Sequence, residues 1–189
     1  MGFGTIIIIF VVVAFVVFAI IAYIVGMFNS LIRLKNNIKK SWANINVLLK
    51  QRSDELPKLI NSVKGYMTHE KDTLVELTKA RTSMLNAKTM SEKADADNAI
   101  SSTLKTIFAV AENYPNLKAN ENFMQLQNRI SGLENELADR REFYNDSVNT
   151  YNIRIHSFPD MIIAGRMKYT DEEMFKVSEE DTKDVEVKF

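Results

Sequence analysis

The sequence predicts an all-α protein, with an N-terminal transmembrane helix followed by an antiparallel up-and-down helical bundle. Three observations support this fold class. The chain opens with a charge-free apolar run, later apolar residues recur every three or four positions, and only three Pro and six Gly occur in 189 residues. So few breakers favour long helices over a many-turned β fold. No segment shows the alternation of apolar and polar residues, bounded by turn signals, that marks a strand.

Residues 1–28 form the predicted membrane anchor. No charged side chain precedes Arg33, and residues 6–25 are Ile, Val or Phe with only four exceptions. Twenty helical residues rise about 30 Å, which is the thickness of the hydrocarbon core of a bilayer. The side chains that we expect to contact lipid are Ile6, Phe10, Phe15, Phe18, Ile21 and Val25.

A cleaved signal peptide is the alternative interpretation of this apolar run. No Lys or Arg precedes the run, and no small-residue cleavage site follows it. The run is also longer than the apolar region of a signal peptide, which usually has about 7–15 residues. The sequence therefore favours an anchor that stays in the chain.

Basic residues set the predicted orientation of the anchor. Arg33, Lys35, Lys39 and Lys40 follow the apolar run, and no acidic residue occurs before Asp54. The positive-inside rule then places the N-terminus outside the cell and the bundle in the cytoplasm, as in a single-pass protein of the cell membrane. The same cations can contact anionic lipid headgroups, or can act as a topology signal alone.

Residues 29–169 form the predicted helical bundle. Apolar residues step by three or four from Leu31 to Leu77, which is the periodicity of a helix. Pro57 interrupts this stripe, and it either kinks the helix or lies in the first turn of a new one; the sequence does not decide between them. A second helix is predicted to start at Ser91 and to end before Pro115. A third is predicted to start after its cap, Asn120, and to end at Pro159. Short connections between such helices imply antiparallel packing.

Residues 170–189 form an acidic tail with few apolar side chains, and we expect it to be mobile. Its acidic residues are Asp171, Glu172, Glu173, Glu179, Glu180, Asp181, Asp184 and Glu186. The sequence assigns no role to this segment.

Most motifs of catalysis and cofactor binding are absent. The chain has no Cys, which excludes disulfides and thiolate chemistry. A di-metal bundle site needs Glu three residues before His. That position is occupied by Tyr66 before His69 and by Ile153 before His156. No glycine-rich phosphate loop or nucleophile elbow occurs. We therefore assign no catalytic residue, metal or cofactor. The balance of 24 basic and 24 acidic residues also argues against a nucleic-acid partner.

Several polar residues fall where the helical stripes predict apolar ones, and they form a candidate buried polar cluster. Buried charges must be paired, whereas the same side chains at the bundle edge would keep their charged groups in water. The two Tyr–Asn pairs repeat at seven residues, so the Asn side chains can bind the backbone of a neighbouring loop or line a polar ligand groove. The cluster comprises Arg52, Glu70, Arg140, Tyr144, Asn145, Tyr151 and Asn152.

Three long segments carry a resemblance to a known family. They are WANINVLLKQRSDELPKLINSVKGYMTHE (42–70), AVAENYPNLKANENFMQLQ (109–127) and REFYNDSVNTYNIRIHSFP (141–159). Together with the apolar N-terminus they resemble the LemA family of bacterial and archaeal membrane proteins, up to about Thr170. The resemblance implies a cytoplasmic bundle of four helices behind an N-terminal anchor, with a new helix or a strong kink near Pro57. It implies no established enzymatic activity or cofactor, and relatives in magnetotactic bacteria are associated with organising magnetosome membranes.

Two functions are compatible with these features. The first is a non-enzymatic, membrane-anchored scaffold that associates with itself or with other membrane proteins at the cytoplasmic face. The second is a ligand-sensing or signalling domain with a pocket between its helices, which the polar residues on the stripes would line. The anchor and the absence of a catalytic constellation favour the scaffold.

Overall fold

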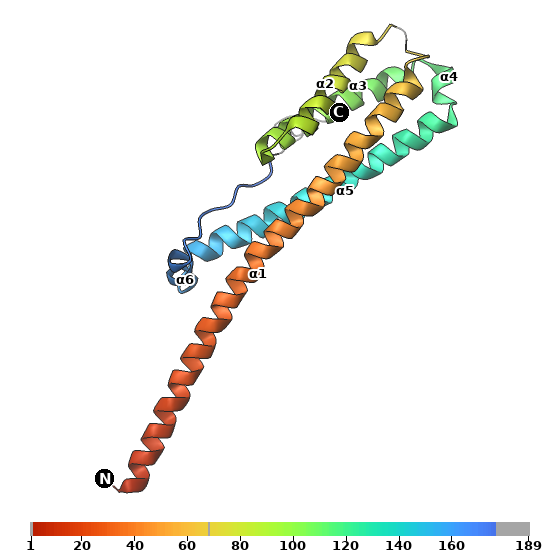
Figure 1. Ribbon diagram of the computed structural model, residues 1–189. Coiled ribbons are helices and arrows are strands. Elements are labelled where there is room, and N and C mark those ends of the chain that lie inside the picture. The colour runs from red at the N-terminus through yellow and green to blue at the C-terminus, as the bar shows by residue number, and fades with distance from the viewer. Residues whose placement is uncertain (1, 68, 177–189) are drawn as a thin grey trace, which may run out of the picture. The chain divides into compact units, whose positions relative to one another are not determined.

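The computed structural model describes residues 2–67 and 69–176, and within these residues the protein has helices and no strand (Figure 1). The predicted all-α class is confirmed. The helices are α1 (Phe3–Val63), α2 (Lys71–Asn86), α3 (Met90–Ala111), α4 (Pro115–Lys118), α5 (Glu121–His156) and α6 (Asp160–Arg166). They belong to two compact units. The first consists of Met1–Lys40 and Asp146–Glu173, and the second of Ser41–Asn145 and Met174–Phe189.

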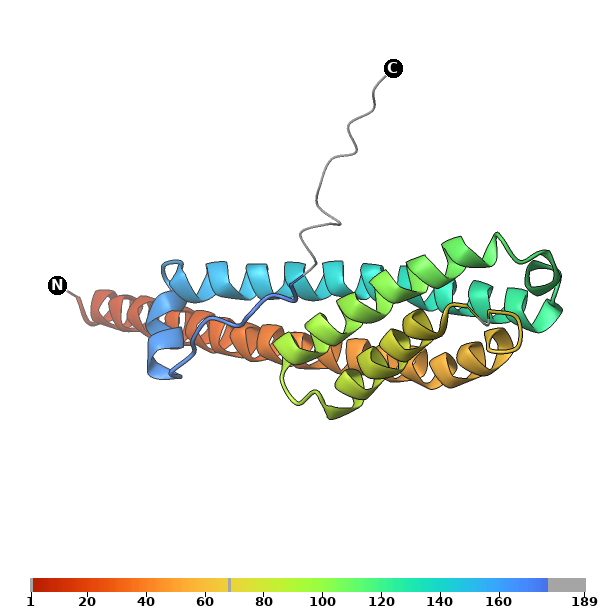
Figure 2. The same cartoon turned by 90° about the horizontal axis from the view of Figure 1, so that it is seen from above.

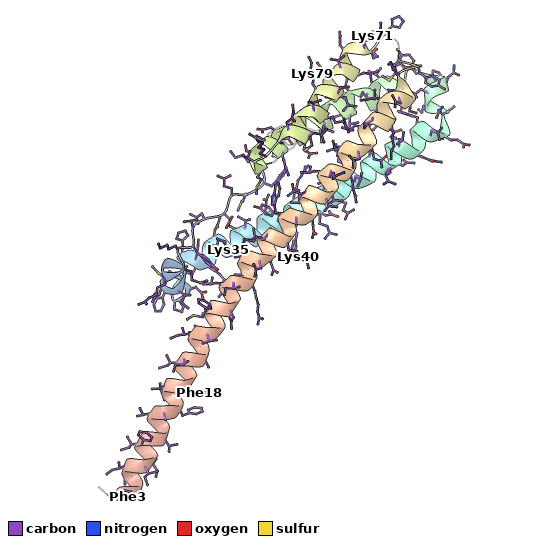
Figure 3. The ribbon with its side chains drawn as sticks, viewed as in Figure 1. Phe3, Phe18, Lys35, Lys40, Lys71 and Lys79 are labelled. Carbon is purple, nitrogen blue, oxygen red and sulfur yellow. The ribbon has the colours of Figure 1, made fainter. Side chains whose placement is uncertain are left out.

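The beginning of α1 is the part of the described chain that is long and apolar enough to cross a membrane. Its apolar side chains project away from the helix without protein neighbours, as Phe3 and Phe18 show in Figure 3. Phe18 is 70% exposed, and all six predicted lipid-facing residues are more than half exposed. Such a long apolar surface is unfavourable in water, whereas a bilayer would cover it.

The second unit is a helical bundle built from the end of α1, from α2, α3 and α4, and from the start of α5. Helices α2 and α3 form a hairpin and lie side by side in both views (Figures 1 and 2). The predicted stripes supply the core of this unit. Its fully buried apolar residues include Ile45, Leu56, Leu59, Leu77, Ile100, Ile107, Ile130 and Leu137. Burial of these stripes stabilises helices that would be marginal alone in water.

Helix α1 continues through Pro57 without a break, so the expectation of a new helix at this position is wrong. Proline lacks the N–H that would bond to the carbonyl four residues earlier, which here belongs to Ser53. The Ser53 carbonyl instead accepts a hydrogen bond of 3.1 Å from Nε of Arg81, which lies on α2. Because Ser53 is buried, this bond replaces the missing helical one and allows α1 to continue.

Other helix boundaries differ from the predictions by a turn or less, with one exception. Helix α1 ends at Val63 and α2 begins at Lys71, so the single stripe predicted from Leu31 to Leu77 is divided by a turn. Helix α3 starts at Met90, and its cap is Thr89, which forms a capping box with Glu92. Hydrogen bonds from the amides of Thr89 and Lys88 lower the pKa of Glu92.

The predicted cap at Asn120 is confirmed. Its side-chain oxygen accepts a hydrogen bond of 3.1 Å from the Phe123 amide, three residues into the helix that follows. The short helices α4 and α6 were not predicted, since neither is long enough to show a periodic stripe.

The continuity of α1 can be tested at Arg81. We expect Arg81→Met to lower the free energy of unfolding by about 1–2 kcal/mol, because it leaves a buried carbonyl without a donor. In a Pro57→Ala background the loss should be smaller, since residue 57 then supplies its own N–H to Ser53. Chemical unfolding of the detergent-solubilised protein, followed by circular dichroism, gives both values. Equal losses in the two backgrounds would contradict the proposed compensation.

Candidate functional site

A network of buried charged side chains lies in the core of the second unit. Arg52 of α1 and Asp97 of α3 are both fully buried, and Nη1 of Arg52 is 2.8 Å from Oδ1 of Asp97. Arg141 of α5 binds the other carboxylate oxygen of Asp97. One aspartate thus joins three helices through two guanidinium groups. A buried charge is stable only when it is paired in this way.

Two more side chains complete the network around Arg52. Its Nη2 donates to Oγ of Ser101 at 3.0 Å and lies 3.3 Å from Oε1 of Glu134. Two arginines therefore face two carboxylates, and their formal charges balance. Burial lowers the pKa of Arg52 below its usual value, while the charge of Glu134 opposes this shift. An arginine keeps its proton under such conditions.

The predicted polar cluster contains one member of this network, Arg52. Arg140 lies outside it, contrary to the prediction: its side chain is 49% exposed and pairs with Glu136 on the same helix at 3.4 Å. Glu70 also lies outside it, because it immediately precedes α2, where it is partly exposed.

The neighbouring residue Arg141 occupies the position predicted for Arg140. Helical steps of three or four from Leu137 reach either residue. Steps of seven back from the buried residues Ile155 and Val148, however, reach Arg141 and then Glu134. Asp97 was missed because the predicted stripe began at Ile100, one helical step too late. One more step at the start of that stripe would have found Asp97, and steps of seven along α5 would have found Arg141 and Glu134.

The first Tyr–Asn pair belongs to the second unit and holds the segment around Phe175. Tyr144 is buried, with its ring centroid 6.0 Å from that of Trp42. The Asn145 side chain donates to the Phe175 carbonyl at 3.1 Å and accepts from the Phe175 amide at 2.8 Å. Phe175 is itself buried, beside Trp42 and beneath the guanidinium of Arg141. Asn145 therefore binds a loop backbone, as one of the two predicted alternatives requires.

The second Tyr–Asn pair makes the equivalent contacts in the first unit. The Asn152 side chain exchanges two hydrogen bonds of 2.9 Å with the backbone of Glu172. Tyr151 is buried, which raises its pKa, and its ring contacts that of Tyr169. Two residues of the acidic segment, Glu172 and Phe175, are thus fixed by side-chain contacts. Residues 177–189 of the predicted mobile tail lie outside the described residues.

One of the four predicted topology residues takes part in these contacts. Lys35 forms an ion pair of 3.2 Å with Glu172 and lies over the ring of Tyr169 at 4.6 Å. Burial alone would lower the pKa of Lys35, but the hydrogen bond with Glu172 and the electrostatic interactions with Tyr151, Glu172 and Tyr169 together outweigh it, so the pKa is raised. Arg33, Lys39 and Lys40 are exposed.

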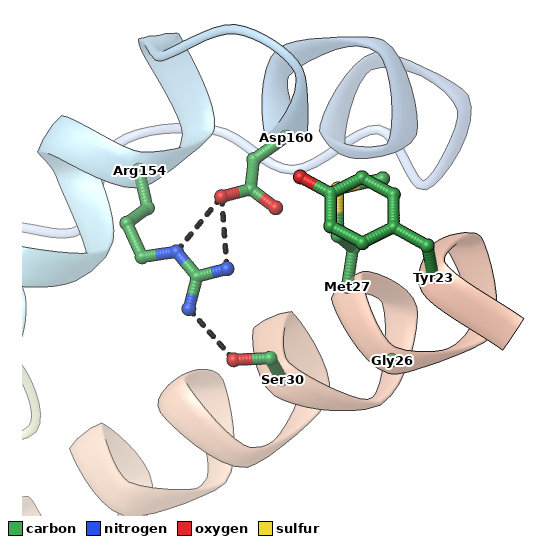
Figure 4. A pocket seen from close by; sticks show the side chains of 6 residues that line it. All are labelled: Tyr23, Gly26, Met27, Ser30, Arg154 and Asp160. Atoms are coloured by element: carbon green, nitrogen blue, oxygen red, sulfur yellow. Dashed lines mark hydrogen bonds and ion pairs between the residues drawn. The ribbon is translucent and has the colours of Figure 1, made fainter. Parts of the chain in front are cut away.

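A polar contact in the first unit joins the end of the apolar run to the end of α5 (Figure 4). Arg154 donates to Oγ of Ser30 at 2.6 Å and forms an ion pair of 2.8 Å with Asp160, the first residue of α6. A hollow of about 340 Å³ adjoins this contact and is lined by Tyr23 and Met27.

No group of His, Asp and Glu that could hold a metal ion is found in the residues that the structure describes. Nε2 of His156 lies 2.9 Å from a carboxylate oxygen of Asp171, and His69 is exposed in the turn before α2.

Together these features define a helical-bundle protein with one candidate membrane-spanning helix at its N-terminus. The chain belongs to the LemA family: the family model matches residues 41–189. The matched region includes the acidic tail, beyond the segments that carry the resemblance in the sequence. The LemA family is not known as a family of enzymes. Family membership and the apolar helix together indicate a membrane-associated protein.

One relative matches most of the chain, and others match about a third of it. The chain is 28% identical over 163 residues to protein LemA of Metamycoplasma hominis, covering 86% of this chain and 74% of that protein. It is 33% identical over 64 residues to magnetosome protein MamQ 2 of Paramagnetospirillum magneticum, covering 34% of this chain and 24% of that protein. Magnetosome protein MamQ of Magnetospirillum gryphiswaldense is 28% identical over a stretch of the same length.

The buried network can be tested by comparing arginines in buried and exposed positions. We expect Arg52→Met to lower the free energy of unfolding by about 3–5 kcal/mol, because it leaves the buried carboxylate of Asp97 with less compensating charge. The matched control Arg140→Met removes an exposed pair and should change it by less than about 0.5 kcal/mol. Denaturant unfolding measures both variants. Similar small losses in both would show that the network contributes little.

The contact between Asn145 and Phe175 gives a second, local prediction. Asn145→Ala removes both hydrogen bonds to Phe175, so the amide of that residue should exchange its hydrogen faster while the helices keep their protection. Asn149→Ala, at an exposed position on the same helix, is the control and should leave this exchange unchanged. Hydrogen exchange read by mass spectrometry follows both variants. Unchanged protection of residues 170–176 in Asn145→Ala would contradict the contact.

Proposed function

We propose that this protein is a non-enzymatic, membrane-anchored helical scaffold whose bundle faces the cytoplasm. The observation that carries the proposal is the composition of α1. This helix of 61 residues is wholly exposed and apolar in its first part, and its later part supplies Arg52 and core residues to the bundle. Because one continuous helix supplies both the span and part of the bundle, the bundle is anchored to the bilayer.

The proposed scaffold associates with itself or organises other membrane proteins. The similarity to proteins named as magnetosome proteins supports a role at membranes, although it covers only a third of this chain. The basic residues after the apolar run, of which Arg33, Lys39 and Lys40 are exposed, support the orientation with the N-terminus outside.

The ligand-sensing alternative loses its main argument in the structure. Among the polar residues that motivated it, Arg52 forms an ion pair with Asp97, and Asn145 and Asn152 bind backbone. A hollow of about 430 Å³ between α1 and α2 is lined by other residues, among them Met67 and Lys71. A specific ligand site needs convergent polar groups that remain available for the ligand.

Crosslinking in intact membranes tests the scaffold. A lysine-reactive crosslinker should give homo-oligomers or one reproducible partner, and the purified complex in detergent should exceed the mass of a monomer with its micelle. As the control for random collisions between protein molecules, the protein is extracted into detergent and diluted strongly before the crosslinker is added. Monomer alone, with no reproducible partner in intact membranes, would contradict the proposal.

The orientation has its own test, since the chain has no cysteine background. A membrane-impermeant thiol reagent should label Gly2→Cys in intact cells, and should label Asp171→Cys only after permeabilisation. Phe15→Cys, inside the apolar run, is the control that neither condition should label. Labelling of Asp171→Cys in intact cells would reverse the orientation.

A further inference from the structure

A small apolar surface lies at the turn between α5 and α6, in the first unit. Phe158 is 79% exposed, Met161 50% and Ile162 58%. Met161, Ile162 and Gly165 lie on one face of α6, and Phe158 lies in the turn directly before this helix, whereas Ala164 is buried. We call residues 158, 161, 162 and 165 the α6 face. Exposed apolar residues gathered in this way mark a contact surface.

The contacts of Arg154 and Asp160 fix the position of the α6 face along α1. Asp160, the first residue of α6, is held by Arg154, which also donates to Ser30 (Figure 4). Ser30 follows Val25, the last residue of the apolar run, by five positions, which is about 7.5 Å of helix rise. Asp160 also shares a hollow with Tyr23 and Met27. The beginning of α6 therefore lies beside the last turns of the apolar run.

The chemistry around the α6 face matches the border between lipid chains and headgroups. Tyr23, an aromatic residue with a polar group, stands near the end of the run, where membrane proteins place such residues. Arg33 and Arg166 are exposed and belong to the same unit. Their charges suit the anionic phosphates of lipid headgroups.

We propose that the α6 face is a second membrane contact, which inserts Phe158, Met161 and Ile162 into the interface of the bilayer that α1 spans. This inference rests on the proposed anchoring by α1. Short apolar faces bind an interface by burying their side chains about 5–10 Å into the boundary between headgroups and acyl chains. The contact would hold α6 and the end of α5 against the bilayer, so that the first unit is bound to lipid at two places.

Site-specific fluorescence in liposomes tests the contact with the full-length protein. Single cysteines at Met161 and Ile162 receive an environment-sensitive label, and the protein is reconstituted in vesicles of phosphatidylcholine and phosphatidylglycerol. Quenchers are a nitroxide near the top of the acyl chain, a nitroxide near the bilayer centre, and iodide in the water. Because both positions are exposed, the substitutions should leave the helical content unchanged, which circular dichroism checks.

Two further labels serve as references. Phe15→Cys lies at the centre of the apolar run and should be quenched most by the deep nitroxide. The second reference is Thr170→Cys, at an exposed position next to Tyr169. The Tyr169 ring contacts Lys35, which lies about 7.5 Å further along α1 than Ser30, away from the apolar run. Iodide should quench this label, and neither nitroxide should.

The expected result is that the labels at Met161 and Ile162 are quenched more by the shallow nitroxide than by the deep one or by iodide. Quenching of these labels by iodide alone, with the Phe15 label quenched by the deep nitroxide, would overturn the inference and leave the anchor intact. Protection from all three quenchers would assign the α6 face to a protein contact and would also overturn it. A Phe15 label that lipid nitroxides do not quench would instead refute the anchoring itself.

Discussion

A helix in lipid must close all its backbone hydrogen bonds within itself, and a helix in water needs packing to be stable; α1 meets both requirements in one element. Its first part is apolar on every side and exposed, while its later part presents a stripe of apolar residues to the bundle. The other features of the chain depend on this division, since the bundle forms where the helices after α1 bury their apolar stripes against its later part.

The buried charged residues that the structure describes in the bundle are tolerated because each is paired with a group of opposite charge. Asp97 is stable in the core because the guanidinium groups of Arg52 and Arg141 neutralise it. Arg52 is stable there because two carboxylates and a hydroxyl group surround its guanidinium. The same logic applies to the backbone at Pro57, where Arg81 supplies the donor that proline lacks. Such partners specify which helix faces meet, because an apolar stripe alone fits many registers.

Much of the fold could be predicted from the sequence, because long periodic stripes and a charge-free run are strong signals. The cap at Asn120 and the buried residues Tyr144 and Tyr151 follow from the same patterns. The partners across helices could not be predicted. Steps of three or four permit both Arg140 and Arg141, and although steps of seven from Val148 favour Arg141, they do not say which side chain of another helix it meets. The turn after Val63 was missed because apolar residues on both sides continue the helical spacing.

The most direct test of the account is the state of the protein in membranes. Vesicles from cells that make the full chain can be washed with alkaline carbonate, and the mass of the retained protein can be measured intact. The account predicts that the protein stays in the pellet and that its mass includes the apolar N-terminus. Release into the wash, or a mass that begins after residue 28, would contradict it.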